Sequence, residues 1–283
     1  MQASLDAHSR ASIASLTGAF RAARRDPTLA VLEGLHALKH ALRFGADLQQ
    51  VAIADPERVR ALAQTLAPDV GERMLAHARI VSPEVFASLA PRAPSTGVIA
   101  IARRPPIDLD ALLAQLRPAP IVLLEQPRDL GNLGACVRVA AAADIAGLIA
   151  SGVHDPWDPA ALRGSAGLHF ALPVAHLRED ALGRLGGGRR GPAGGAADAT
   201  AGEVAHGLRP LIAIDPDGEE LRPALLPPRA ILAFGSERQG LSEQLLGRAD
   251  ALVRLPMREG VSSLNLATSV AALLYAWRLA DVR

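Results

Sequence analysis

The sequence predicts an α/β protein in which a small N-terminal α/β domain precedes a larger domain built on a parallel sheet. Short apolar runs alternate with helical patterns along most of the chain, as they do in α/β folds. The run Ile121 to Leu124 is apolar at every position, which is typical of a parallel strand covered on both faces. Polar loops follow such runs, and sheets of this kind bind ligands beyond the carboxyl ends of their strands.

The composition limits the classes of function. A chain of 283 residues allows one large or two ordinary domains, and a hydrophobic content of 49% supplies a buried core. The formal net charge is +1, so no global basic field indicates a nucleic-acid partner. Aromatic residues make up 3%, which argues against an extended base-stacking platform.

Cys136 is the only cysteine, which excludes a disulfide or a cysteine-based zinc site within one chain and fits a reducing compartment. The N-terminus has no signal pattern and no run of 18 apolar residues occurs, so we expect a cytoplasmic protein without a membrane partner. His36 and His40 stand four residues apart on a predicted helix. They lack a third ligand, so surface or boundary histidines are favoured over a metal pair, and we expect no metal.

Residues 1–104 are predicted to form the N-terminal domain. Residues 1–26 are interpreted as a frayed surface helix, with an RNA-contacting arm as the alternative. A helix is predicted from Val31 to the stop at Gly45. The other predicted elements of this domain are strands at 51–54, 80–81 and 98–101 and helices at 57–66 and 83–89.

Residues 105–120 are predicted to be a linker, because proline pairs bracket a short helix from Asp108 to Leu116. The second domain, residues 121–283, is predicted to continue with a helix at 135–143 and strands at 148–150 and 211–214. Residues 183–207 are rich in Gly and Ala and are interpreted as a mobile insertion. The Gly pattern at 186–191 has no strand before it and no apolar helix after it, so it does not predict a dinucleotide site.

Two stretches carry candidate chemistry. In the first, Asn132, Gly134 and Arg138 follow the apolar run at 121–124, and Asn132 is placed to cap the helix that bears Arg138. A capped helix with a surface arginine is the alternative interpretation.

The second stretch is the last quarter of the chain. A Gly-containing turn from Phe234 to Ser242 follows one strand, and a polar loop from Leu255 to Asn265 follows the next. Glycine lets the backbone approach a ligand closely, so the two loops predict one composite small-molecule pocket. The final helix follows, and Leu266, Val270, Leu273 and Trp277 form its apolar face.

With these motifs in this order, the segment from Ile121 to Trp277 resembles the SpoU/TrmH-type RNA 2′-O-ribose methyltransferases of the SPOUT superfamily. That family carries a Gly-Ser-Glu-x-x-Gly-Leu-Ser turn and a Pro-Met loop that ends in Ser-Leu-Asn, and both are present here. The resemblance implies a C-terminal trefoil knot and bound S-adenosyl-L-methionine. Residues 32–47 resemble, more weakly, the substrate-binding domain that precedes the catalytic domain in many members, which is similar to a ribosomal-protein RNA-binding fold.

The resemblance also implies site residues. Catalytic roles fall on Arg138, Asn132 and Glu237, and RNA contacts on Arg138, Arg163 and Ser165. For Arg163 the alternative is a structural role, in which Asp158 caps a helix and Arg163 forms an ion pair. The implied cofactor-binding residues are Leu232, Phe234, Gly235, Ser236, Gly240, Leu255, Pro256, Met257, Ser263, Leu264 and Asn265.

The chain departs from the family pattern at three positions. Leu130 stands where proline is usual, Arg238 where glycine is common, and Glu259 where the third motif usually has glycine. The last two alter the loops that the resemblance assigns to the cofactor.

The resulting expectation is an S-adenosylmethionine-dependent RNA 2′-O-methyltransferase that acts on ribosomal RNA rather than tRNA and forms a homodimer through its C-terminal domain. The alternative is a non-catalytic RNA-binding or ribosome-assembly factor on the same scaffold. A generic doubly wound nucleotide-binding enzyme fits less well, because a valid Gly fingerprint and its acidic ribose ligand are missing from the sequence.

Overall fold

The computed structural model describes residues 14–76, 78–178, 182, 185, 209–222 and 226–280. The chain divides into two compact units: unit 1 comprises residues 1–106 and 157–171, and unit 2 comprises residues 107–156 and 172–283. Residues 157–171 thus lie inside the range predicted for the methyltransferase domain but group with the N-terminal unit. The predicted insertion at 183–207 falls outside the described residues, apart from Leu185. Within the part of the chain that is described, no helix is both long and apolar enough to cross a membrane.

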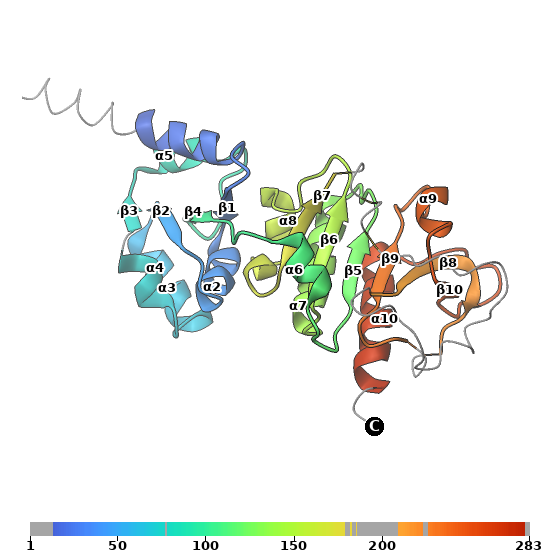
Figure 1. Ribbon diagram of the computed structural model, residues 1–283. Coiled ribbons are helices and arrows are strands. Elements are labelled where there is room, and N and C mark those ends of the chain that lie inside the picture. Colours follow the sequence, from blue (N-terminus) through green and yellow to red (C-terminus); the bar gives the residue numbers. More distant parts are fainter. Residues whose placement is uncertain are drawn as a thin grey trace, which may run out of the picture. The chain divides into compact units, whose positions relative to one another are not determined.

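Unit 1 contains a mixed four-stranded sheet (Figure 1). Its strands, in spatial order, are β1 (Leu29–Glu33), β4 (Val98–Arg103), β2 (Leu48–Ile53) and β3 (Ala78–Ile80). The β4 strand is antiparallel to both of its neighbours, and β3 is parallel to β2.

Helices cover the sheet of unit 1. They are α2 (Leu35–Arg43), α3 (Pro56–Leu66), α4 (Gly71–Ala76), α5 (Pro83–Ser88) and α8 (Pro159–Gly164), with a 3₁₀ turn, η1, at Leu168–Phe170. Three of these helices start alike, because the side chains of Asp55, Ser82 and Asp158 each accept a hydrogen bond from a backbone N–H in the first turn. The helices predicted at 57–66 and 83–89 are confirmed.

The helix predicted from Val31 is wrong at its start. Residues 29–33 form β1, which pairs with β4 from Leu29 opposite Arg103 to Glu33 opposite Ile99. Gly34, with a φ of +97°, then turns the chain into α2. A short apolar run satisfies a strand pattern and a helix pattern equally, and here a partner strand remote in sequence decided between them.

Near the N-terminus the predicted helix is confirmed for its described part, but its predicted surface position is wrong. Residues 14–23 are helical, and Leu16, Phe20 and Ala23 are buried in one cluster with Phe86 of α5. The same cluster takes in alternate strand residues Val31, Ala52, Ile99 and Ile101, so this helix covers one face of the unit 1 sheet. Residues 1–13 lie outside the described residues.

Unit 2 contains a six-stranded sheet in which every pairing is parallel. The strands, in spatial order, are β10 (Ala251–Arg254), β8 (Leu211–Glu220), β9 (Ile231–Phe234), β5 (Ile121–Leu124), β6 (Gly147–Ser151) and β7 (Val174–Leu177). The strands predicted at 121–124, 148–150 and 211–214 are confirmed, as is the strand predicted before the turn that starts at Phe234. Residues 121–124 are fully buried, as predicted for a strand covered on both faces.

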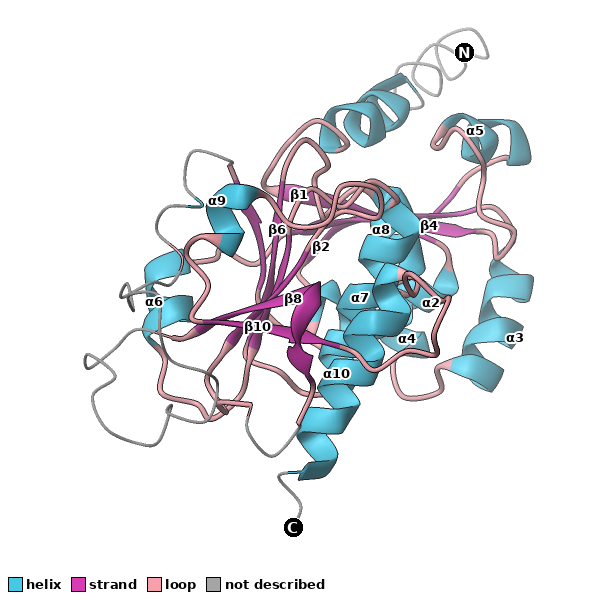
Figure 2. Ribbon diagram, turned by 90° about the vertical axis from the view of Figure 1, so that its right-hand side faces the viewer, coloured by secondary structure: helices cyan, strands magenta, loops and turns pink. Residues whose placement is uncertain are grey.

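The helices of unit 2 are α6 (Leu109–Ala114), α7 (Leu130–Ala142), α9 (Glu243–Leu246) and α10 (Leu266–Ala280). Helices α7 and α10 pack side by side (Figure 2). The predicted apolar face of α10 is buried, with Val270 and Leu273 fully inaccessible. Arg209, which is 2% exposed, donates to the carbonyls of Leu113, Gln115 and Ala119, and so fastens the end of α6 and the following segment to the start of β8.

Candidate functional site

The first motif lies at the carboxyl end of β5, the strand between β6 and β9 in the sheet of unit 2. Asp129 caps α7, because its carboxylate accepts from the backbone N–H of Asn132 at 2.7 Å. The prediction that Asn132 caps this helix is therefore wrong: the helix begins at Leu130, and Asn132 lies in its first turn. Since Asp129 satisfies the helix start, the Asn132 amide is free to join other loops.

The second motif is a closed turn at the carboxyl end of β9. Ser236 and Gly240 exchange two backbone hydrogen bonds, of 3.1 and 3.0 Å, and the buried Ser236 hydroxyl accepts from the N–H of Gln239. A Cβ on Gly235 would lie 2.0 Å from the carbonyl carbon of Gly240, so only glycine fits. The backbone of Gly240 and Leu241 therefore passes directly over Gly235 at the end of β9, closer than a side chain on Gly235 would allow.

The third motif ends at Asn265, immediately before α10. Its side-chain oxygen accepts from the backbone N–H groups of Ala267 and Thr268, and so caps the helix. Its amide nitrogen donates to the side-chain oxygen of Asn132 at 3.0 Å. Asn132 in turn donates to Glu237 at 3.2 Å.

This relay of Asn265, Asn132 and Glu237 connects the three motifs, which are far apart in the sequence. Each amide donates through its nitrogen and accepts through its oxygen, so the direction of the chain of hydrogen bonds is the same throughout. Glu237 ends it as an acceptor, and its second oxygen accepts from the backbone N–H of Arg128 at 3.2 Å. The turn after β9 is thereby held to the end of the loop after β5 and to the first turn of α7.

The relay keeps Glu237 ionised. Burial is the largest single influence and opposes ionisation, but the hydrogen bonds that the carboxylate accepts, including that from Asn132, together outweigh it and lower its pKa. At neutral pH Glu237 is therefore a carboxylate whose two oxygens are engaged by donors, an arrangement that suits a positioning group better than a proton acceptor.

Arg138 lies on α7 nearly two turns beyond Asn132 and is exposed. No hydrogen bond or ion pair joins it to another residue in the described part of the chain. A guanidinium stays protonated in proteins and offers only donors, so Arg138 presents a free cation on the surface of unit 2. Asn132 of the relay and Arg138 thus lie on the same helix, but no hydrogen bond or ion pair joins them.

The other predicted cofactor residues divide into two groups. Leu232 and Phe234 are buried within β9, so only their backbone groups can reach a ligand. Five residues of the third loop, in contrast, have partly or largely exposed side chains: Leu255, Pro256, Met257, Ser263 and Leu264.

These features fit S-adenosyl-L-methionine. The loop at 255–265 begins after the edge strand β10 and ends at Asn265, which touches the β5 loop, so it crosses the carboxyl ends of the strands between them. It carries the exposed apolar side chains of Val261 and Leu264, which can cover an adenine, beside the tight backbone turn at Gly235. Strand ends with apolar cover and convergent amide groups suit a nucleoside joined to an amino acid.

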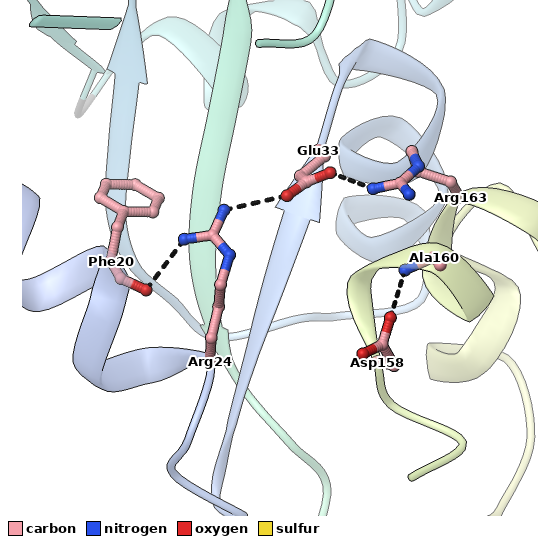
Figure 3. Close-up of polar contacts among 6 residues, drawn as sticks. All are labelled: Phe20, Arg24, Glu33, Asp158, Ala160 and Arg163. Atoms are coloured by element: carbon pink, nitrogen blue, oxygen red, sulfur yellow. Dashed lines mark hydrogen bonds and ion pairs between the residues drawn. The ribbon is translucent and has the colours of Figure 1, made fainter. Parts of the chain in front are cut away.

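The implied RNA-binding residues Arg163 and Ser165 belong to unit 1 and are engaged there. Arg163 forms an ion pair with Glu33, whose side chain is 4% exposed and also pairs with Arg24 at 2.9 Å (Figure 3). Asp158 caps α8, and the hydroxyl of Ser165 is fully buried within hydrogen-bonding distance of His169. The interactions of the structural alternative are therefore present.

The shared carboxylate makes a stability prediction. We expect Glu33→Gln to lower the free energy of unfolding by about 1–2 kcal/mol, because two charge-assisted bonds weaken while Arg163 is half-exposed and keeps part of its hydration. Urea denaturation followed by circular dichroism measures this change. Glu57→Gln is the matched control: Glu57 also pairs with an arginine, Arg60, but its side chain is 83% exposed, so its loss should change little. Equal effects of the two substitutions would contradict the prediction.

Cys136 is fully buried in α7. Burial, with a smaller contribution from the Glu237 carboxylate, raises the pKa of its thiol to about 12. The thiolate is therefore almost absent at neutral pH.

We predict that Cys136 is inert in the folded protein. Relative to a thiol with the ordinary pKa of 9.0, a pKa of about 12 lowers the thiolate fraction at pH 8 roughly a thousandfold, and burial also blocks access. An Ellman assay at pH 8 should detect no thiol until denaturant is added, and then one per chain, since Cys136 is the only cysteine. Rapid modification of the native protein would show that α7 opens.

Sequence reasoning missed one group at this end of the sheet. Glu125 follows β5 directly and is 3% exposed, and its carboxylate accepts from the backbone N–H of Ser242 at 2.7 Å. Its position immediately after a fully apolar strand was the signal that could have identified it. A charge there is carried into the interior with the strand, and its burial is costly unless a partner binds it.

Comparison with known proteins agrees with the motifs. The model of the SpoU rRNA Methylase family matches residues 119–184 and 196–275, which is more than half of the chain. An uncharacterized tRNA/rRNA methyltransferase of Synechocystis is 28% identical over 88% of this chain and 83% of its own length.

Two further relatives have named activities or ligands. The 23S rRNA (adenosine(1067)-2'-O)-methyltransferase of Streptomyces laurentii is 32% identical over 63% of this chain, which spans 60% of that relative. Among solved structures, the SpoU methyltransferase AviRb of Streptomyces viridochromogenes, crystallised with AdoMet, is similar with a TM-score of 0.67. That likeness covers 89% of this chain and 90% of AviRb at 24% identity, which establishes a shared fold.

Proposed function

Because the chain belongs to the SpoU rRNA methylase family and is an S-adenosylmethionine-dependent RNA 2′-O-methyltransferase, we propose that its substrate is ribosomal RNA. The 23S rRNA activity named for the Streptomyces laurentii relative supports this substrate over tRNA. The methyl-transfer site itself is supported by the relay from Asn265 through Asn132 to Glu237, which joins the three family motifs at the strand ends of unit 2.

In the proposed site, bound S-adenosylmethionine supplies an electrophilic methyl group on its sulfonium. Asn265 and the loops at 235–241 and 255–265 would hold the cofactor, exclude water and orient the cofactor toward the attacking ribose oxygen. Asn132 and Glu237 fix the relative positions of these loops.

Arg138 acts on the RNA. Its exposed guanidinium clamps the phosphate next to the target ribose and polarises the 2′-hydroxyl, and it stabilises the charge that develops on the oxygen. It does not take the proton, because a neutral guanidine is too costly at neutral pH. The proton leaves to phosphate or to water. Arg163 and Ser165 carry no part of this proposal, because Arg163 is paired with Glu33 and Ser165 is buried.

Mapping of 2′-O-methyl groups in cellular RNA, with and without the gene, tests the substrate. We expect one or a few ribosomal RNA positions to lose their methyl group and to regain it when the purified protein and S-adenosylmethionine are supplied. Loss of a tRNA methyl group instead would overturn the ribosomal assignment. Unchanged RNA, together with cofactor-dependent binding but no transfer, would favour the non-catalytic assembly factor.

We further propose that the last part of unit 2 forms the trefoil knot of the family. The support is the path of the chain: β10 is an edge strand, whereas α10 packs against α7 and Asn265 reaches the loop after β5. The chain therefore returns across the strand ends before its last helix. An experimental electron-density trace through residues 226–280 and the loops around them tests the knot.

We also propose a homodimer through unit 2. Two large apolar side chains are exposed on α10, namely Tyr275 and Leu279, and neither is assigned to the cofactor. A second copy of the chain can cover them, and two-fold dimers are the commonest oligomers.

We predict that light scattering at micromolar concentration gives the mass of a dimer, and that Leu279→Arg shifts it to a monomer. Leu116→Arg is the control. Leu116 is also exposed in unit 2, but it follows α6 and does not belong to α10. A monomeric wild-type protein with full activity would contradict the dimer.

A further inference from the structure

The buried carboxylate of Glu125 has no place in the mechanism above. It lies at the end of β5, and its backbone N–H donates to the carbonyl of Phe234 at 2.8 Å, at the end of the adjacent strand β9. A carboxylate that is 3% exposed is costly to bury unless hydrogen bonds stabilise it. In the described part of the chain it makes one such bond with its side chain, the one to the N–H of Ser242.

Ser242 stands where the turn after β9 ends. The hydroxyl of Ser242 caps α9, because it accepts from the backbone N–H of Leu245. The Ser236–Gly240 pair closes the turn, and β9 holds the residues that enter it. The bond to Glu125 fixes the residues that leave it. Without this bond, residues 241 and 242 could move away from Gly235, whose backbone now lies close to that of Leu241.

We propose that Glu125 is a positioning residue that sets the affinity for S-adenosylmethionine by holding the turn at 235–241 to β5 through the Ser242 N–H. The inference rests on the proposed cofactor role of that turn. The relay holds the turn at Glu237, near its start. Glu125 holds the chain at Ser242, where it leaves the turn. A turn fixed at both points is ordered before the cofactor arrives, so binding loses less conformational entropy.

Two pairs of variants test the inference by calorimetry with S-adenosylmethionine. We expect Glu125→Ala to weaken binding by roughly 10- to 100-fold, and Glu125→Gln to stay within about threefold of wild type, because its amide oxygen can still accept from Ser242. Ser242→Pro removes the donating N–H while its φ of −68° already suits proline, so it should weaken binding like Glu125→Ala. Ser242→Ala removes only the hydroxyl cap of α9 and should lower the melting temperature without changing cofactor affinity.

The double variant Glu125→Ala/Ser242→Pro distinguishes a shared bond from two separate defects. We expect it to bind no more weakly than either single variant, because both remove the same interaction. Binding by Glu125→Ala at wild-type affinity, below its melting temperature, would overturn the inference, as would losses that add up in the double variant.

Hydrogen exchange of the cofactor-free protein separates this inference from the proposed function. We expect the peptide spanning 235–246 to exchange faster in Glu125→Ala than in wild type or Glu125→Gln, with peptides from unit 1 unchanged. If the wild-type protein bound no S-adenosylmethionine, the proposed function would fail, while unchanged exchange in Glu125→Ala would refute the positioning role independently.

Discussion

Arg138→Ala should lower the rate of methyl transfer at saturating RNA by about two orders of magnitude or more, as removal of other preorganised charge-stabilising groups does. The reason is its position: Arg138 is an exposed cation on α7 that no described residue neutralises, so its charge is available to RNA and to the developing oxyanion. The affinity of the Arg138→Ala variant for S-adenosylmethionine should stay within about threefold of wild type, a difference near 0.6 kcal/mol, because no hydrogen bond or ion pair links Arg138 to the relay. Single-turnover methylation and calorimetry measure the two quantities.

Two further variants make this result specific. Arg138→Lys keeps the charge but loses the planar fork that binds a phosphate through two bonds, so we expect an intermediate rate. Arg117→Ala removes another exposed arginine of unit 2, one that precedes β5 and so lies at the end of the strand opposite to the site, and this variant should transfer methyl groups at the wild-type rate. If Arg138→Ala methylates at near the wild-type rate, the catalytic role assigned to this residue is wrong.

Asn265→Ala should fail in the opposite way, by weakening S-adenosylmethionine binding. One lost hydrogen bond contributes about 0.5–1.5 kcal/mol, and a partner that the bound cofactor buries without its hydrogen bond costs roughly 1–3 kcal/mol, so the expected loss is several-fold to about a hundredfold. The variant also removes the cap of α10, since Asn265 accepts from the N–H groups of Ala267 and Thr268, which should lower stability by about 1 kcal/mol. Calorimetry with the cofactor and thermal unfolding separate the two effects.

Asn265→Asp is the matched control. An aspartate keeps the oxygen that caps α10 but cannot donate to the side-chain oxygen of Asn132, so it breaks the relay alone. We expect wild-type melting and weak cofactor binding. Wild-type binding by this variant would show that the bond to Asn132 does not organise the site, and that the effect of Asn265→Ala comes from the frayed helix.

Hydrophobic patterns in the sequence determined most elements of unit 2. The fully apolar run at 121–124 identified a central strand, and the apolar face that includes Val270 and Leu273 identified the last helix. These predictions succeed because a buried parallel strand and an amphipathic helix each have a period that is visible without knowledge of their neighbours. The same reasoning failed at residues 29–33 and 14–23, where the partner that decides between strand and helix, or between surface and core, is remote in sequence.

The motifs likewise determined the family, its cofactor and the residue types of the site, because the spacing of Asn132 to Arg138 and the two later loops are local features of the chain. Only the tertiary structure decided how those residues connect. Asp129 took over the helix cap, and the Asn132 amide was therefore available to bridge Asn265 and Glu237 across more than a hundred residues. In unit 1, Arg163 forms an ion pair with Glu33. At the carboxyl end of β5, the buried Glu125 carboxylate accepts from the Ser242 N–H. A side chain's partner depends on which donors and acceptors folding brings within about 3 Å, and no pattern in the sequence encodes that distance.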